Sequence, residues 1–280
     1  LTIGNKVPSI GDRAFESIFI NTQNAKLTIG SSVKSIGSMA FYRCVFSGGD
    51  TIVIPSSVQK VGGQFLSQFK GAKNLDFQAT IDVLKQIDML GLESFETLKI
   101  SHTTTFGMKC LYGYTNFKTI TIENAKSFMS YAFANTSFNQ DLVISDSVTS
   151  LGTGCFSYSK WTGSLTIKAN VYEIDPSIFS HATFGGSKLI IENVQSIGPR
   201  AFEGCFTSKI SIEINSIKVF GSMAFYGCNV ETITVPATTN LIGRAAFCGA
   251  KCDKLNIKTQ LKDTNSTWFD GENQIQQLEL

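Results

Sequence analysis

The chain has few charged residues and only two histidines, and both features limit the classes of protein to which it can belong. Only 16% of its 280 residues are charged, against about 25% in typical soluble domains. The formal net charge of +2 gives no preference for nucleic acid or for an anionic membrane surface. No apolar run approaches the ~18 residues needed to cross a bilayer. We therefore predict no nucleic-acid partner and no membrane insertion within this segment.

Catalytic and metal-binding signatures are also missing. The two histidines, His102 and His181, stand in different parts of the chain and in no spacing typical of zinc ligands. No nucleophile elbow, Walker-type loop or dinucleotide fingerprint occurs. A nucleophilic triad would have to draw cysteine and histidine from distant segments. We predict that the protein is not an enzyme, with no catalytic residue, no metal and no cofactor.

What the chain does have is a repeat. A short Leu-x-Ile-like run returns along its whole length, and its second apolar residue serves as a marker. The markers are about 23 residues apart, with extremes of 21 and 26. They are Ile3, Ile29, Ile54, Phe77, Ile100, Ile122, Ile144, Ile167, Ile191, Ile212, Val235, Ile257 and Leu280. A period of 20–29 residues with this core is typical of leucine-rich repeats, with one strand per coil.

A second column of residues supports the same register. Ten of its twelve positions are phenylalanine, which predicts an aromatic ladder through the core. The column is Phe15, Phe41, Phe65, Leu90, Leu111, Phe133, Phe156, Phe179, Phe202, Phe225, Phe247 and Phe269. Four residues earlier stands a glycine in most coils, as at Gly37 and Gly221, with Asp175 and Asn265 in two others. These residue types tolerate positive φ, so we expect a left-handed corner at this position.

The predicted fold is an α/β leucine-rich-repeat solenoid that is rich in β-structure. It has about twelve coils of ~23 residues, a continuous parallel β-sheet, and short 3-10 or helical turns on the opposite side. The Val-x-x-Ile-Gly segments are candidates for a second sheet. In the fourth coil, Leu75–Phe95, a nearly helical apolar spacing leaves a local helix as one of two alternatives. We interpret residues 1–280 as one domain, and as a segment of a longer array, because neither end resembles a polar capping repeat.

The seven cysteines resemble a reactive set until they are placed in the repeat. Six stand where a small apolar side chain is required, and free cysteine behaves as a small hydrophobe. They are Cys44, Cys110, Cys155, Cys205, Cys228 and Cys252. Cys248 follows Phe247, where strand alternation should expose it, so a Cys248–Cys252 bridge is conceivable. The odd total argues against a full disulfide framework.

The strand surface is the predicted binding face, because the residue between two apolar markers points outward. Its outward column is rich in Thr and Val, and we expect it to carry no charge from Thr121 to Thr234. The candidate partner-binding residues are Thr121, Val143, Thr166, Ile190, Ser211 and Thr234. The alternative is that β-branched residues simply suit a half-exposed strand. The partner would be a protein or a glycan, and the chain itself a monomer or weak oligomer.

Two sequons add a conditional prediction. Asn135 and Asn265 each begin an Asn-x-Ser/Thr triplet. Both are candidate glycosylation sites if the chain is secreted by a eukaryote.

The repeat skeleton L-x-I-P-x-S-V-x-x-I-G-x-x-A-F-x-x-C resembles the BspA-like, or Treponema pallidum-type, leucine-rich repeat. The resemblance covers essentially the whole chain, and its best segments are Leu27–Cys44, Ile52–Phe65, Leu142–Phe156, Leu189–Cys205 and Ile233–Phe247. It implies a surface or secreted protein of a host-associated bacterium or anaerobic protist. The implied function is a non-enzymatic adhesin that engages host matrix or cell-surface partners. The alternative is a cytoplasmic structural or assembly scaffold of the same fold. The family has no catalytic motif, so no functional residue is carried over.

Overall fold

The computed structural model describes residues 1–22, 25–259, 266–269 and 274–279. The chain forms two compact units, Leu1–Ala125 and Lys126–Leu280, called unit 1 and unit 2 below. Each is a parallel β-solenoid with a spacing of ~23 residues, about 11 turns in all. The predicted solenoid class is therefore confirmed. The interpretation of residues 1–280 as one domain stays a prediction.

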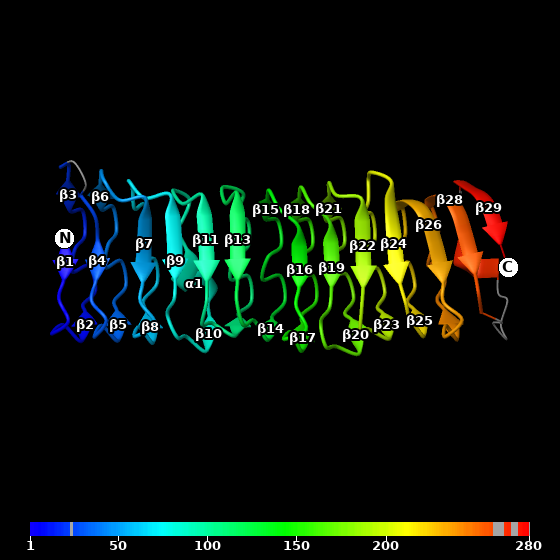
Figure 1. The fold of residues 1–280 in the computed structure, drawn as a ribbon, viewed down its shortest axis with the longest axis horizontal. Coiled ribbons are helices and arrows are strands. Elements are labelled where there is room, and N and C mark those ends of the chain that lie inside the picture. The colour runs from blue at the N-terminus through cyan, green and yellow to red at the C-terminus, as the bar shows by residue number, and fades with distance from the viewer. Residues whose placement is uncertain (23–24, 260–265, 270–273, 280) are drawn as a thin grey trace. The chain divides into compact units, whose positions relative to one another are not determined.

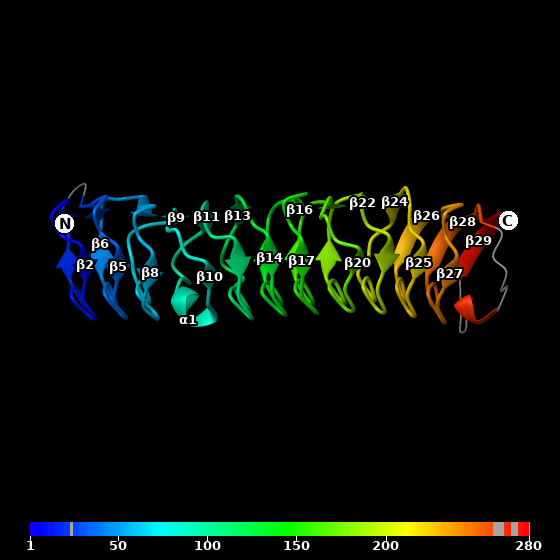
Figure 2. The ribbon, with the colours of Figure 1, turned by 90° about the horizontal axis from the view of Figure 1, so that it is seen from below.

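Unit 1 has strands on two sides of its coils, and on a third side in the first two coils. On the first side, β1 (Thr2–Ile3) pairs with β4 (Thr28–Ile29), and a four-stranded sheet follows (Figure 1). That sheet consists of β7 (Thr51–Ile54), β9 (Asn74–Phe77), β11 (Thr97–Ile100) and β13 (Thr119–Ile122). The second side, seen in Figure 2, holds β2 (Ser9–Ile10), β5 (Ser35–Ile36), β8 (Lys60–Val61), β10 (Val83–Leu84) and β12 (Thr105–Phe106). The third side holds β3 (Phe19–Ile20) and β6 (Val45–Phe46).

Unit 2 repeats this plan more regularly. Its first sheet has seven parallel strands in sequence order. They are β16 (Leu142–Ile144), β19 (Leu165–Ile167), β22 (Lys188–Ile191), β24 (Ile210–Ile214), β26 (Asn229–Val235), β28 (Lys251–Ile257) and β29 (Gln274–Glu279). The second side holds β14 (Ser127–Phe128), β17 (Ser150–Leu151), β20 (Glu173–Ile174), β23 (Ser196–Ile197), β25 (Val219–Phe220) and β27 (Leu241–Ile242). The third side holds β15 (Ser137–Phe138), β18 (Lys160–Trp161) and β21 (Thr183–Phe184). The candidate second sheet is thus present, whereas the third side was not anticipated.

Helix is almost absent from the described residues. They contain one four-residue α-helix, α1 (Gln86–Met89), and one 3-10 stretch, η1 (Ser266–Phe269). α1 lies in the fourth coil, where the apolar spacing allowed a helix. The Asp88 carboxylate accepts a hydrogen bond from the Lys85 backbone N–H at 3.0 Å and closes the first turn. Elsewhere the wall opposite the first sheet is made of tight turns.

The aromatic ladder exists, and in unit 2 it runs unbroken from Phe133 to Phe247; the side chain of Phe269, the last predicted member, lies outside the described part of the chain. Neighbouring rings from Phe133 to Phe247 stack with centroids between 5.0 and 6.1 Å apart. In unit 1 the ladder begins with Phe15 and Phe41, whose centroids are 5.4 Å apart. Each well-buried phenylalanine contributes roughly 1.5–3 kcal/mol. Stability therefore comes from the contact between coils.

The assignment of Phe65 to this ladder is wrong by one residue. Phe41 donates its N–H to the Phe65 carbonyl, as Phe15 donates to the Ala40 carbonyl. Phe65 thus occupies the position of Ala40, and buried Leu66 follows Phe41 in the column. A second column of aromatic rings lies beside the ladder in both units. In unit 1, Phe69 stacks on Phe46 at 5.6 Å and on Phe95 at 6.1 Å, and in unit 2 the rings of Phe138 and Trp161 have centroids 4.6 Å apart.

The predicted left-handed corner is also misplaced. The positive φ values fall two residues beyond the glycine column, as at Met39 (54°) and Arg200 (56°), and not at Gly37 or Asp175. The N–H of Met39 is held by the Gly63 carbonyl of the next coil at 3.0 Å, which offsets the cost of the left-handed backbone. Asn265 lies outside the described residues.

The glycine column is required by close stacking of backbones. A Cβ at Gly37 would lie 2.5 Å from the backbone nitrogen of Asp12 in the preceding coil. A Cβ at Gly62 would lie 2.2 Å from the backbone nitrogen of Ser38. Both distances are far below van der Waals contact, so a side chain at this column would force the coils apart.

All seven cysteines are free and buried, including Cys248, which is only 7% exposed. Its expected exposure is wrong because it lies in a tight turn between Ala245 (φ 54°) and Gly249 (φ 67°), where strand alternation does not apply. The structure holds no Cys248–Cys252 bridge. Burial raises the pKa of Cys228 to about 12 and the pKa of Cys155 and Cys205 well above the usual value.

Candidate functional site: the strand face of unit 2

The outward side of the first sheet in unit 2 is formed by one residue per coil between two buried neighbours. Leu142 and Ile144 are buried on either side of Val143, which is 59% exposed. The sheet pairs Val143 with Thr166, and Thr166 with Ile190, as the repeat predicts. Because the inner strands share their backbone hydrogen bonds with both neighbours, side chains alone are available to a partner on this face.

The predicted row slips at the fourth strand. Ile190 lies beside Glu213, whereas Ser211 lies beside Lys188. The alternation Ile-Ser-Ile-Glu-Ile in β24 is compatible with two registers. The predicted marker is Ile212, whereas the residue that pairs with the marker Ile191 is Ile214. A spacing of 23 residues from Ile191 selects Ile214 as the marker and would have revealed the correct register.

We call the observed outward residues the face row. They are Val143, Thr166, Ile190, Glu213, Thr234 and Asn256. Ser211 belongs to the adjacent row with Lys188 and Thr232, and a register irregularity separates it from Ile210. Val143 and Glu213 are exposed, and the other four residues of the row are half-buried. The five unit 2 candidates thus lie on one face, although not in one row, and their role in binding stays a prediction.

The expectation of an uncharged row is wrong at Glu213. Its carboxylate lies 3.2 Å from the Lys188 ammonium, and both side chains are about half exposed (52% and 53%). A second pair, Lys168 and Glu192, lies 3.8 Å apart at the carboxyl end of the neighbouring strands. Exposed pairs of this kind contribute little to stability. They leave the face with charges of both signs, with exposed Val143 on its first strand and half-buried Ile190 beside Glu213.

Unit 1 presents a different strand face. Its outward row is Val53, Asp76, Lys99 and Thr121. Thr121, the remaining candidate, is exposed there. The Lys99 ammonium lies 3.0 Å from the Glu123 carboxylate. That contact lowers the pKa of Glu123 and raises the pKa of Lys99.

A further acid on the same unit lies between two bases. Glu96 accepts a hydrogen bond from Lys118 at 2.6 Å and lies 4.0 Å from Lys73. The Lys118 hydrogen bond is the main cause of its lowered pKa. The strand face of unit 1 is therefore a network of compensated charges, and a partner would have to break it.

The histidines and the first sequon have ordinary structural surroundings. The Nδ1 atom of His102 lies 2.9 Å from the Gln78 carbonyl, and the His181 ring packs on Tyr158 with centroids 5.1 Å apart. Asn135 is exposed at a left-handed turn with φ 56°. Its modification stays a prediction, and Asn265 lies outside the described residues.

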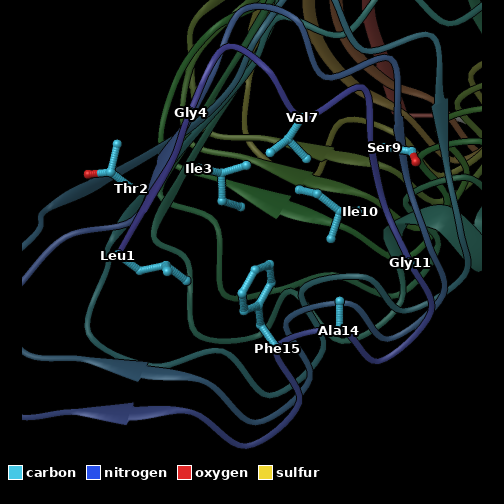
Figure 3. Close-up of a pocket in the computed structure, with 10 residues that line it drawn as sticks. All are labelled: Leu1, Thr2, Ile3, Gly4, Val7, Ser9, Ile10, Gly11, Ala14 and Phe15. Atoms are coloured by element: carbon cyan, nitrogen blue, oxygen red, sulfur yellow. The ribbon is translucent and has the colours of Figure 1, made fainter.

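A hollow of about 270 Å³ opens at the first coil of unit 1 (Figure 3). Ile3, Val7, Ile10 and Phe15 point into it. In the second coil the equivalent residues include Val33 and Phe41, which are fully buried. We interpret the hollow as the open end of the core columns, because its lining is the ordinary interior of a coil.

The described residues contain neither a membrane-spanning helix nor a group of metal ligands. No helix in them is long and apolar enough to span a bilayer. Within the same residues, no three His, Cys, Asp or Glu side chains are grouped so that they could hold a metal ion.

Comparison with known families decides the repeat class. The family described as "BspA type Leucine rich repeat region (6 copies)" matches residues 1–105, 90–207 and 195–280. The chain belongs to this family. No curated protein matches the chain. The predicted resemblance to BspA-type repeats is thus confirmed along the whole length.

Several solved leucine-rich repeat structures are similar to this chain at low identity. A leucine-rich repeat protein from Bacteroides ovatus is 17% identical, with a TM-score of 0.55 over 97% of this chain and 82% of that chain. A leucine-rich repeat protein from Eubacterium ventriosum is 19% identical, with a TM-score of 0.46 over 89% and 76%. A leucine rich cell surface protein from Faecalibacterium prausnitzii is 19% identical, with a TM-score of 0.40 over 94% and 85%. The first of these supports a leucine-rich-repeat fold for this chain.

Proposed function

We propose that the protein is a non-enzymatic binding scaffold that acts at a cell surface or after secretion, as an adhesin for a protein or glycan. The alternative is a structural scaffold inside the cell, built from the same repeats. Membership of a repeat family of protein-binding scaffolds supports both versions. The adhesin version rests on the family resemblance of the repeat.

The observation that carries the proposal is the face row of unit 2. The core columns and the backbone ladder hold the coils together without these side chains, so the row is free to vary for recognition. Val143 is 59% exposed beside half-buried Thr166 and Ile190. Scattered exposed apolar groups are normal, but here they share one regular sheet face, as in the extended binding surfaces of other solenoids.

Catalysis finds no support in the geometry. His102 belongs to unit 1 and His181 to unit 2. Each histidine contacts a structural group, and burial raises the pKa of the thiols of Cys155, Cys205 and Cys228, which disfavours a nucleophilic thiolate.

The test is capture of the chain on wells coated with purified matrix glycoproteins and on a glycan array. We expect the double variant Val143→Glu with Thr166→Lys to lose at least about tenfold in binding, since it places two charges at the apolar end of the face row. The matched control is Ser127→Lys with Ser150→Glu. It introduces the same charges on β14 and β17, which pair on the second side of unit 2.

Both variants should keep the circular dichroism spectrum and melting temperature of the parent chain. Equal loss of binding in the two variants, or none in the face variant, would refute the face row as the docking surface. The adhesin version fails if the full-length protein stays in the cytosol, with no exported pool and no capture on any coated well.

A further inference from the structure

Two of the seven cysteines occupy the same position in successive coils. Cys205 and Cys228 each stand three residues after a ladder phenylalanine. Ile197 of β23 pairs with Phe220 of β25. Cys205 and Cys228 each lie eight residues after these paired residues, so they are equivalent positions of successive coils. The coils before and after place Ala182 and Ala250 in this column. The two thiols are therefore a stacked pair with alanine on both sides.

Their contacts draw the two coils together. The Cys228 thiol donates to the Phe202 carbonyl of the preceding coil at 2.9 Å. The same carbonyl accepts the backbone N–H of Cys205 at 3.1 Å. Cys228 is thus aimed at the turn that ends at Cys205. The Phe202 and Phe225 rings beside them have centroids 5.0 Å apart, the shortest spacing in the ladder of unit 2.

The spacing of the coils is compatible with a disulfide. Directly before the two cysteines, the Gly204 N–H donates to the Tyr226 carbonyl of the next coil at 2.7 Å. Coils hydrogen-bonded in this way stack ~4.8 Å apart, within the range of about 4.4–6.8 Å found between the Cα atoms of bridged cysteines. The Cβ atoms of a bridge must come to about 3.5–4.5 Å, so the two turns have to approach by about 0.3–1.3 Å. Gly204 and Gly227 directly precede the two cysteines, with φ of 60° and 68°. A Cβ at Gly227 would meet nothing within 4 Å, whereas a Cβ at Gly204 would lie 2.7 Å from Nδ1 of His181, so the open space lies beside the turn that carries Cys228.

We propose that Cys205 and Cys228 form a disulfide between successive coils when the chain folds in the presence of a small-molecule disulfide such as oxidised glutathione. Two S–H bonds break and one S–S bond forms. The two electrons and two protons pass to glutathione disulfide, which is released as two molecules of reduced glutathione.

The bond forms before the coils close. Both thiols are fully buried, and burial raises the pKa of Cys228 to about 12 and the pKa of Cys205 well above its usual range. The thiolate is the species that attacks a disulfide, so the folded, reduced protein should be inert. During refolding, both thiols are exposed and approach each other as coil stacks on coil. This inference does not depend on the proposed binding function.

The experiment is refolding of the whole chain from guanidinium into a mixture of reduced and oxidised glutathione. Intact mass spectrometry should show a loss of about 2 Da, and a tryptic map without reductant should show Cys205 joined to Cys228. Trypsin separates the two because Lys209 and Lys218 lie between them. Folded, reduced protein incubated in the same buffer should keep its mass.

Cys44 provides the matched control, because its thiol makes the same contact, to the Phe15 carbonyl at 2.8 Å, without a cysteine in the adjacent coils. Cys44→Ala should keep the linked peptide, and Cys228→Ala should lose it. Alanine is suited to the site because Ala250 fills it in the next coil. The melting temperature of oxidised parent chain and Cys44→Ala should fall on reduction, and that of Cys228→Ala should not. Seven free thiols after refolding, mixed glutathione adducts, or a link between other cysteines would each overturn the proposal.

Discussion

Units 1 and 2 follow the same repeat with different side chains. Comparing them shows which positions the fold constrains and which positions it allows to vary. In unit 2 the stacked rings run unbroken from Phe133 to Phe247. In unit 1 the residue that follows Phe41 in this column is Leu66, which is not aromatic. The stacked rings of that coil are Phe46 and Phe69 of the second column. A coil therefore needs its interior filled, and either column can supply the aromatic volume.

The strand faces differ more than the cores. Unit 1 places Glu96 between Lys118 and Lys73, with Lys99 beside Glu123. In unit 2 the pairs Lys168–Glu192 and Lys188–Glu213 lie near Ile190, a third pair joins Lys209 to Asp253, and Val143 is exposed. The core columns hold the coils together without these outward side chains, and the exposed apolar group is the reason for proposing unit 2 as the docking surface.

The largest expected effect on stability is that of a substitution in the aromatic core, compared with one on the strand face. Phe202→Ala should lower the free energy of unfolding by roughly 3–5 kcal/mol, because it opens a cavity between rings of adjacent coils. Thr166→Ala on the face row should cost much less, since its side chain is half-buried on a face that packing leaves free. Denaturant midpoints measure both. Equal midpoints would mean that the face and core columns have been exchanged.

A smaller effect on stability tests why glycine recurs at this position. Close stacking of backbones and a left-handed corner are the two explanations, and they predict different effects of alanine. Gly62→Ala should destabilise the chain by about 1–3 kcal/mol, because its Cβ would overlap the backbone of Ser38. Gly11→Ala occupies the same column in the first coil, where a Cβ would meet nothing within 4 Å. It should be neutral or slightly stabilising. A comparable loss at both positions, seen by thermal melting, would restore the corner explanation.

The smallest expected effect concerns the charges of unit 1. Lys118→Met should raise the pKa of Glu96 toward its usual 4.5, since the Lys118 hydrogen bond is the main cause of its lowered value. A lowered carboxyl pKa stabilises the fold above the usual pKa, and that contribution disappears as the pH falls through the folded pKa. Carboxyl carbon NMR titration measures the change. Lys99→Met is the control, because it should move the pKa of Glu123 and leave Glu96 unchanged.

Much of the solenoid could be predicted from spacing alone. Periodic Ile and Phe positions identify strands and core columns because each coil must bury the same side of its backbone as its neighbours. The errors of register fall where the chain offers two neighbouring apolar residues for one position. Phe65 and Leu66 compete for one core position, and Ile212 and Ile214 compete for one strand position. Local pattern does not choose between such pairs, and the backbone hydrogen bonds to the adjacent coil do.

The candidate site shows the same division. The sequence places Val143, Thr166 and Ile190 on one face, because alternation within a strand is a local property. It could not place Glu213 beside Ile190, nor the Cys228 thiol on the Phe202 carbonyl, because both depend on the contact between coils. The sequence by itself determined the repeat, the aromatic core and the outward direction of the face. Tertiary structure decided the register and the role of each glycine, because these depend on how closely one backbone stacks on the next.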